Sequence, residues 1–587
     1  MLQHHTLALS CCHISFVSLF LAAHIFHSHT SSSSLILLLD DRRSQFKKGI
    51  DADESRRRRT ETTISLRKSK KDEGIAKRRA RVMAPTTMMA NDASSISPVV
   101  HGESKREHVY TTQDIPSLMQ QLHEIQQSGI MDGDKLKQIA QAFRKIMSVE
   151  HNPPVHEVLQ SGALPFLVQM LSLADKPLVQ FEAAWAITNI ASTDQTAVIV
   201  DAGAIPPLVQ LLTSASADNR EQAAWCLGNV AGDSTTLRDV VLAANAMQPL
   251  ILNIIKPGSD SLLTNCVWAL SNFCRGKPQP AISQIESAIP AIVDILRGDN
   301  EDAKIDALWA LSYISDGTEE HIDAVLRSNV APLLVELLGA ESESKILTPA
   351  LRSVGNIVTG NDRQTQAILD ADFLKRMQFL LNHERRAIKK EACWVLSNIA
   401  AGTEKQIGYV LGKHGCMAQV AEMAEHATWE VRKEAIWVVS NVATGGNKCQ
   451  VQSVVECGAI DSLCSLLDIN DTKMLLVALD ALESILRVGQ DLNKDYCSFV
   501  DECDGLEKLE QLQEHQSDDV YKKAVEIIET FFGCEDELED ENLAPTLNGD
   551  TYAFGIPQKQ IDESFEAECP ANGHGSQPFA TFNFAAV

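Results

Sequence analysis

The feature that most constrains this chain is a short segment that recurs every 40 to 43 residues between about residues 115 and 530. The copies read AAWAITN, AAWCLGN, CVWALSN, ALWALSY, ALRSVGN, ACWVLSN and AIWVVSN. A fixed period of this length indicates one structural unit stacked many times, which is an array rather than a single globular core. The central residues of the copies, called the marker residues below, are Trp185, Trp225, Trp268, Trp309, Arg352, Trp394 and Trp437.

A turn motif also recurs once in several of the repeats. It reads GALP at 162–165, GAIP at 203–206, SAIP at 287–290 and GAID at 458–461. A helical period near 42 with Gly and Pro punctuation is typical of armadillo or HEAT arrays. The aromatic content of 5% fits cores made of Leu, Ile, Val and Ala. The sequence therefore predicts an all-α, right-handed armadillo-repeat solenoid of about ten repeats over residues 115–533.

Six of the seven tryptophans are marker residues, and only Trp429 lies elsewhere. An asparagine four positions after a marker lies on the same face of the helix. Because asparagine suits neither a helix interior nor an apolar core, we interpret this face as exposed, lining the inner side of the array. The alternative is that both residues recur only as core residues of a repeated unit.

These residue types suit one kind of ligand. A primary amide can both donate to and accept from the backbone of an extended peptide. Neighbouring indoles can receive the stem of a Lys or Arg, with cation–π attraction of about 0.5–2 kcal/mol. The candidate carboxylates at the rim are Asp233, Asp316, Glu391 and Glu434. The pattern predicts a receptor for extended basic peptides, divided at Arg352 into two sites that could be engaged together.

Charge is distributed unevenly along the chain. The whole chain carries a net charge of −26, yet residues 42–81 hold 16 basic against 6 acidic residues. An acidic body argues against nucleic acid as its direct partner. We expect the basic arm, tethered by a flexible linker over 82–114, to fold back onto the array and compete with other basic peptides. The other reading of the arm is a solvated charge run or a nucleic-acid tail.

The two ends differ from the array. Residues 15–26 form an apolar stretch like the core of a signal peptide, but no Lys or Arg precedes it, so we interpret residues 1–41 as a non-functional extension. Residues 534–587 begin acidic and become low in complexity, which predicts disorder. Scattered cysteines, with no metal-spaced set and no phosphate-binding loop, predict reduced thiols, no cofactor, no metal and no enzymatic activity.

The basic arm joined to the Trp–Asn pattern resembles the importin alpha (karyopherin alpha) family over about residues 42–535. The resemblance implies a nuclear import adaptor with a cargo site on each side of the break at Arg352. It implies a major cargo site at Trp185, Asn189, Thr196, Trp225, Asn229, Asp233, Trp268 and Asn272. We place the minor site at Trp309, Tyr313, Asp316, Arg352, Asn356, Glu391, Trp394, Asn398, Glu434, Trp437 and Asn441.

The same resemblance implies that residues 42–81 bind importin beta. The matching basic residues are Arg56, Arg57, Arg58, Arg59, Arg67, Lys68, Lys70, Lys71, Lys77, Arg78 and Arg79. It further implies recycling by an export receptor with Ran-GTP, indirect contact with nuclear pore components, and shuttling between cytoplasm and nucleus. No direct nucleic-acid binding or membrane insertion is expected.

One departure from the family concerns the loop after Ser192, which is about two residues shorter than usual and lies beside the major site. Two other classes remain open at this point. An armadillo scaffold for signalling would need neither the asparagines nor the basic arm. A secreted or membrane-tethered armadillo protein would depend on residues 15–26 alone.

Overall fold

The computed structural model describes residues 109–149, 152–412, 416–533, 546–548 and 551–553. The chain divides into two compact units, one ending at Ile527 and the other beginning at Ile528. The N-terminal extension, the basic arm with its arginines and lysines, and most of the linker lie outside the described residues.

The first unit consists, over its described residues, of helices in a repeated order. The first helices of the repeats are α5 Val155–Gln160, α8 Thr196–Asp201, α11 Thr235–Ala243, α14 Ile282–Ile285, α17 Glu319–Arg327, α20 Asp362–Asp370, α23 Glu404–Leu411, α26 Lys448–Glu456 and α29 Tyr496–Glu502. The second helices are α3 Ile115–Ser128, α6 Ala163–Leu171, α9 Ile205–Leu211, α12 Met247–Ile255, α15 Ile289–Arg297, α18 Ala331–Glu336, α21 Met377–Asn382, α24 Cys416–His426, α27 Ala459–Cys464 and α30 Gly505–Gln511.

Each repeat ends with a longer third helix. These are α4 Gly133–Ile146, α7 Pro177–Ala191, α10 Ala217–Asp233, α13 Asp260–Phe273, α16 Glu301–Ser315, α19 Ser344–Val358, α22 Arg386–Ala400, α25 Trp429–Gly445, α28 Thr472–Leu492 and α31 Asp518–Ile527. Short 3-10 helices join some of the elements, at η1 Thr112–Asp114, η2 Glu286–Ala288, η3 Phe373–Arg376 and η4 Leu512–Glu514.

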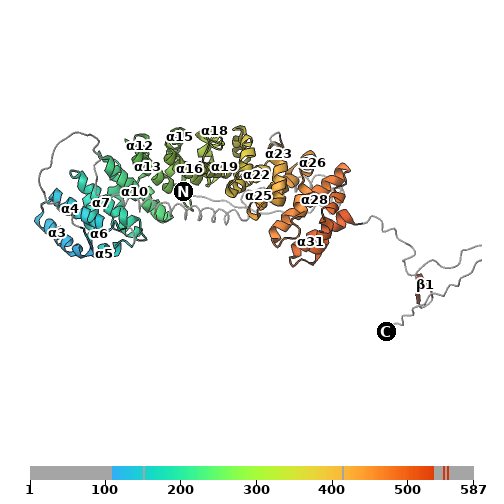
Figure 1. The fold of residues 1–587 in the computed structure, drawn as a ribbon, viewed down its shortest axis with the longest axis horizontal. Coiled ribbons are helices and arrows are strands. Elements are labelled where there is room, and N and C mark those ends of the chain that lie inside the picture. Colours follow the sequence, from blue (N-terminus) through green and yellow to red (C-terminus); the bar gives the residue numbers. More distant parts are fainter. Residues whose placement is uncertain (1–108, 150–151, 413–415, 534–545, 549–550, 554–587) are drawn as a thin grey trace, which may run out of the picture. The chain divides into compact units, whose positions relative to one another are not determined.

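Each third helix packs against the third helix of the next repeat, from α4 through to α31 (Figure 1). Polar residues start several of them: the side chains of Ser216, Ser259 and Asn300 accept hydrogen bonds from backbone N–H groups of the first turn. Helices packed on several sides bury residues around most of their circumference. In α10, for example, Ala223, Leu227 and other small apolar residues are fully buried.

The turn between the first and second helices needs a left-handed backbone conformation. Gly162, Gly203 and Gly458 of the predicted turn motif adopt it, with φ of 78°, 75° and 91°. In other repeats Asn245 and Asn329 take the same place, with φ of 59° and 54°. Glycine and asparagine tolerate this region best, which explains why the motif alternates between them.

The predicted all-α armadillo solenoid is confirmed, because stacked three-helix units form the whole of the first described unit. The second unit contains a π-helix at Ile528–Phe532 and a two-stranded antiparallel hairpin, β1 Thr546–Asn548 with β2 Thr551–Ala553. That hairpin lies within the tail for which we expected disorder; the rest of the tail from residue 534 lies outside the described residues. None of the described helices is both long and apolar enough to span a membrane.

Candidate peptide-binding surface

The marker residues and the residues four positions after them lie on consecutive third helices, from α7 to α25. We call this set the marker row. Most of its tryptophans are half-buried, and Trp225 is 9% exposed. We predicted that the indole rings of this row are exposed, and the structure shows them only partly exposed.

The asparagines of the marker row are buried, so the prediction that they are exposed was wrong. Asn272, Asn356 and Asn441 are between 3% and 8% exposed. In each of them Nδ2 donates to a backbone carbonyl of the preceding third helix, at 3.0, 2.8 and 2.9 Å respectively. The acceptors are the carbonyls of Gly228, Ser312 and Ser397. These amides therefore connect consecutive repeats.

Asn189 and Asn398 follow variants of this pattern. Asn189 donates to the carbonyl of Arg144 at 3.3 Å and to the hydroxyl of Ser148 at 3.2 Å. Asn398 turns back to the carbonyl of Trp394 in its own helix, at 2.8 Å. In both cases the amide donor is used within the protein.

Asn229 is the exception in the marker row. It is 1% exposed, yet neither Nδ2 nor Oδ1 has a hydrogen-bond partner among the described residues. Nearby on α10, Oε1 of the buried Gln222 also has no partner there. A buried amide without partners is costly, by about 1–3 kcal/mol. These two side chains thus hold unused donors and acceptors on one face of α10.

Two glycines fix how closely the indoles approach. A Cβ at Gly228 would lie 2.4 Å from Cζ3 of Trp268, and one at Gly355 would lie 2.0 Å from Cζ3 of Trp394. Each glycine directly precedes a marker-row asparagine, so the indole of the next repeat packs on bare backbone. Sequence spacing alone did not reveal this role.

The break in the tryptophan row is an ion pair. Arg352 donates twice to Glu391 of the next third helix, from Nε and Nη2, each at 2.9 Å. Their side chains are 16% and 7% exposed. Glu391 was expected to receive cargo cations at the rim, but it is buried and its oxygens bind Arg352, so this expectation needs correction.

The remaining candidate residues are placed as follows. Asp233 is exposed at the end of α10, and Glu434 is half-buried on α25. Asp316 forms an ion pair with Lys277 at 3.5 Å, and the ring of Tyr313 stacks on Trp309 with centroids 6.1 Å apart.

Thr196 is the first residue of α8, directly after the loop that follows Ser192, and is 1% exposed. Its hydroxyl donates to the carbonyl of Thr193 at 2.9 Å. It therefore stabilises the loop for which the sequence predicted a shortened length.

A weaker copy of the repeat lies one period before Trp185, at the end of α4, where Arg144 takes the marker position and Ser148 the position four residues later. Both residues are part of the site. The guanidinium of Arg144 lies over the ring of Trp185, 4.5 Å from its centroid, and Nε donates to Glu182 at 2.5 Å. Nε2 of Gln141 donates to the other Glu182 oxygen at 3.0 Å. The sequence contained a signal for this pair, because an arginine takes the place of the marker tryptophan at both Arg144 and Arg352.

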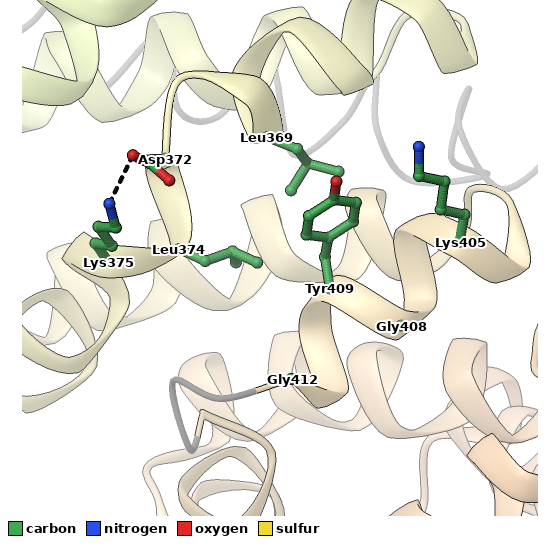
Figure 2. Close-up of a pocket in the computed structure, with 8 residues that line it drawn as sticks. All are labelled: Leu369, Asp372, Leu374, Lys375, Lys405, Gly408, Tyr409 and Gly412. Atoms are coloured by element: carbon green, nitrogen blue, oxygen red, sulfur yellow. Dashed lines mark hydrogen bonds and ion pairs between the residues drawn. The ribbon is translucent and has the colours of Figure 1, made fainter.

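Two hollows lie outside the marker row. One, of about 410 Å³, is lined by Leu369, Leu374, Tyr409 and neighbouring residues of α20, η3 and α23, with the Lys375–Asp372 ion pair at its edge (Figure 2). The other, of about 540 Å³, lies beside Trp429 and the start of α28. There Lys433 lies 4.8 Å from the centre of the Trp429 ring and 2.6 Å from Asp471.

The described cysteines are free thiols, most of them buried. Burial raises the pKa of Cys226 and of Cys274 to about 12. No cluster of three or more His, Cys, Asp or Glu side chains suited to a metal occurs among the residues that the structure describes.

Comparison with family models gives three matches. Residues 42–134 match the importin beta binding domain. Armadillo/beta-catenin-like repeats match at 151–192, 192–232, 277–316, 318–359, 361–401 and 447–487, and an atypical Arm repeat matches at 494–546.

Full-length relatives are also found. The chain is 41% identical over 531 residues to importin subunit alpha-1a of Oryza sativa subsp. japonica, covering 88% of this chain and 96% of the relative. It is 43% identical over 539 residues to importin subunit alpha-3 of Arabidopsis thaliana, covering 89% and 98%. Among solved structures, an engineered protein superimposes with a TM-score of 0.64 and 27% identity, over 71% of this chain and 98% of that one.

Proposed function

The chain belongs to the importin alpha family, and from that premise we propose that it is a nuclear import adaptor that binds basic nuclear localisation signals along the marker row. The family and the armadillo fold are non-enzymatic, and the chain is not an enzyme. Binding here is recognition without covalent chemistry. The unused amide of Asn229 is the observation that carries this proposal.

Asn229 supports peptide binding because both of its amide atoms are unpaired among the described residues, whereas the donors of the other marker-row asparagines are used. An extended peptide brings an N–H and a C=O at each residue, which are the two partners that a primary amide lacks. Gaining them removes the cost of the buried orphan groups, so peptide binding and relief of that cost coincide.

The tryptophans supply the second half of recognition. The position of Arg144 over the Trp185 ring supports a role for these indoles in holding cations. Cargo lysines or arginines would use the neighbouring indoles in the same way, each gaining about 0.5–2 kcal/mol. The exposed carboxylate of Asp233, at the end of the helix that carries Asn229, is suited to a cargo ammonium group.

The partners follow from the domain order. Residues 42–134 match an importin beta binding domain, and we infer that the basic arm at 42–81 links cargo to importin beta. In the absence of importin beta, the arm competes with cargo for the marker row. Recycling would use an export receptor with Ran-GTP, with pore contacts made indirectly through the carriers, so the adaptor shuttles between cytoplasm and nucleus.

The test measures binding of a fluorescent basic localisation peptide to residues 82–587 and to residues 42–587. We expect micromolar or tighter binding to the shorter chain and binding at least tenfold weaker when the arm is attached. Importin beta added to the longer chain should restore the affinity. A peptide of the same composition and net charge, with its basic residues dispersed along the sequence, is the control for simple electrostatics.

The position of binding is tested by Asn229→Ala and Asp233→Lys, each expected to weaken binding at least tenfold. Asn382→Ala, at the exposed end of α21 and outside the marker row, is the matched control. Absence of binding by the shorter chain would refute the proposal and favour a scaffold for other extended peptides.

A further inference from the structure

Two arginines occupy marker positions, and both make the same contact. Arg144 pairs with Glu182, and Arg352 pairs with Glu391. Each glutamate lies three residues before the marker of the next repeat, Trp185 and Trp394 respectively. The shared offset means that each marker residue faces the residue three positions before the marker of the next repeat, which we call the facing residue. We define a slot as the space between a marker residue, the facing residue and the marker of the next repeat.

At most junctions of the array the facing residue is polar and the marker is an indole. Trp185 is followed by Gln222 at the facing position, Trp225 by Asn265 and Trp268 by Asp306. On the proposed function, a slot of this kind presents an aromatic face and a polar or acidic group, which together suit a lysine or arginine side chain. The marker residue itself supplies no cation there.

The first slot is filled from within. The Arg144 guanidinium lies 4.5 Å from the centre of the Trp185 ring and 2.5 Å from the Glu182 carboxylate. The two charged side chains are only 5% and 7% exposed. Arg144 thus makes the two contacts that a cargo cation would make in that slot. Asn189 of the same junction is also satisfied, by the carbonyl of Arg144 and the hydroxyl of Ser148.

We propose that Arg144 is a built-in occupant that closes the first slot and thereby fixes the register in which a basic peptide lies on the marker row. This inference depends on the proposed function. Without Arg144, Glu182 and Trp185 would form a further cation slot, and a lysine-rich peptide could move by one repeat toward α4. With Arg144 in place, the first slot open to cargo is the one between Trp185 and Trp225, next to the unsatisfied Gln222 and Asn229.

The test uses the full chain and three labelled peptides. One peptide has a four-residue basic cluster; the other two carry one additional lysine, two residues beyond either end of the cluster. For the wild-type chain we expect the three affinities to agree within about twofold. For Arg144→Ser we expect one of the extended peptides to bind about tenfold tighter than the plain one, since a cation–π contact contributes about 0.5–2 kcal/mol and 1.4 kcal/mol is tenfold.

Arg144→Ser leaves the buried Glu182 carboxylate without a counter-charge and with only the Gln141 amide as a hydrogen-bond donor, so the variant could fail to fold. Arg144→Ser combined with Glu182→Gln avoids the unpaired charge and keeps a polar wall like that of Gln222. Melting of the far-UV circular dichroism signal reports folding of each variant. Arg352→Ser is the matched control, because it opens the other filled slot. It should not change the relative affinities of the three peptides for the slot beside α4.

The outcomes separate the two proposals. If the wild-type chain does not bind the plain peptide, the proposed function fails. If it binds, and the folded variants show the same affinity ratios as the wild-type chain, the inference about Arg144 is wrong. A direct check needs no variant: a photoreactive residue two positions beyond either end of the cluster should never cross-link to α4 of the wild-type chain. Labelling of α4 would overturn the inference.

Discussion

The junction between α4 and α7 and the junction around Asn229 have the same helical framework but opposite chemistry. At the first, Arg144 pairs with Glu182 and Asn189 donates to the Arg144 carbonyl, although Nη1 of Arg144 has no partner among the described residues. At the second, Asn229 and Gln222 are as deeply buried, yet both Asn229 amide atoms and the Gln222 carbonyl oxygen lack partners in the described chain. The junction of Arg352 with Glu391 belongs to the first kind.

On the proposed function, this difference separates stabilisation from recognition through small changes at one column of residues. An arginine at the marker position pairs with the facing glutamate and closes the junction. At the junction of α7 with α10 the marker is Trp185, and the Gln222 carbonyl oxygen and both Asn229 amide atoms have no partner among the described residues. We call these closed and open junctions.

The largest expected effect comes from breaking a closed junction. Removing one partner of a buried ion pair leaves the other charge uncompensated, at a cost of about 3–5 kcal/mol. Arg352→Ala should therefore lower the thermal unfolding midpoint strongly, as measured by calorimetry. The double variant Arg352→Met with Glu391→Leu removes both charges and should be much less destabilising. Equal destabilisation by the single and double variants would argue against this account of the closed junction.

A second effect concerns the close approach of indole and backbone. Gly228→Ala and Gly355→Ala would place a methyl group 2.4 and 2.0 Å from the Trp268 and Trp394 rings. We expect each to destabilise by about 1–3 kcal/mol through overpacking. Urea denaturation followed by tryptophan fluorescence measures this. Gly408→Ala, whose Cβ would meet only Gln450 Nε2 at 3.4 Å, is the helical control and should be neutral or slightly stabilising.

The third prediction compares how two asparagine substitutions change stability and peptide binding. Asn356→Leu removes a donor to the carbonyl of Ser312 and should cost about 1–2 kcal/mol of stability. Asn229→Leu removes an amide that has no partner in the described part of the chain, so it should leave stability unchanged or increase it, while weakening peptide binding at least tenfold. Denaturation and fluorescence anisotropy, applied to both variants, give the two readouts. Equal loss of stability in both would mean that Asn229 is structural like its neighbours.

The smallest expected effect is on the reactivity of two buried cysteines, which measures how tightly each kind of junction is packed. Cys226 follows Trp225 at the open junction, and Cys393 precedes Trp394 at the closed one. Burial raises the pKa of Cys226 from 9.0 to about 12, and burial also raises that of Cys393. Because the thiolate is the reactive form, Cys226 at pH 8 should react about 1000-fold more slowly than an unperturbed thiol. The exposed Cys449 should react at once.

Mass spectrometry after timed alkylation identifies the modified thiols. The raised pKa values of the buried thiols in the folded state also predict how the stability of the protein changes with pH. The unfolded thiols ionise above pH 9 while the folded ones stay protonated, so stability should fall as pH rises from about 9 toward 12. Rapid labelling of Cys226 in the native chain would show that the open junction is loosely packed as well as unsatisfied.

The period of the sequence was sufficient to predict the fold. Residues at a fixed offset of about 42 specify one unit and its stacking, and the turn glycines mark where first and second helices meet. The third helices that carry Trp185 to Trp437 lie where the marker spacing placed them.

The environment of the asparagines could not be predicted in this way. The i, i+4 relation places Asn272 on the same face as Trp268, but it does not say whether that face meets solvent or the neighbouring helix. The contact of Asn272 with Gly228 spans 44 residues and depends on how two repeats pack. The same limit hid the Arg144–Glu182 pair, although an arginine at a marker position with a glutamate 38 or 39 residues later occurs twice.

Every slot described above has walls from two successive repeats, as Arg352 and Glu391 illustrate. A change in one repeat is therefore inherited by the slots on both sides of it. Gene duplication or loss of a whole repeat preserves this shared architecture and changes only the number of slots. Deletion of part of a third helix would put every later marker out of phase. The unit in which binding capacity can evolve in this protein is thus one complete repeat.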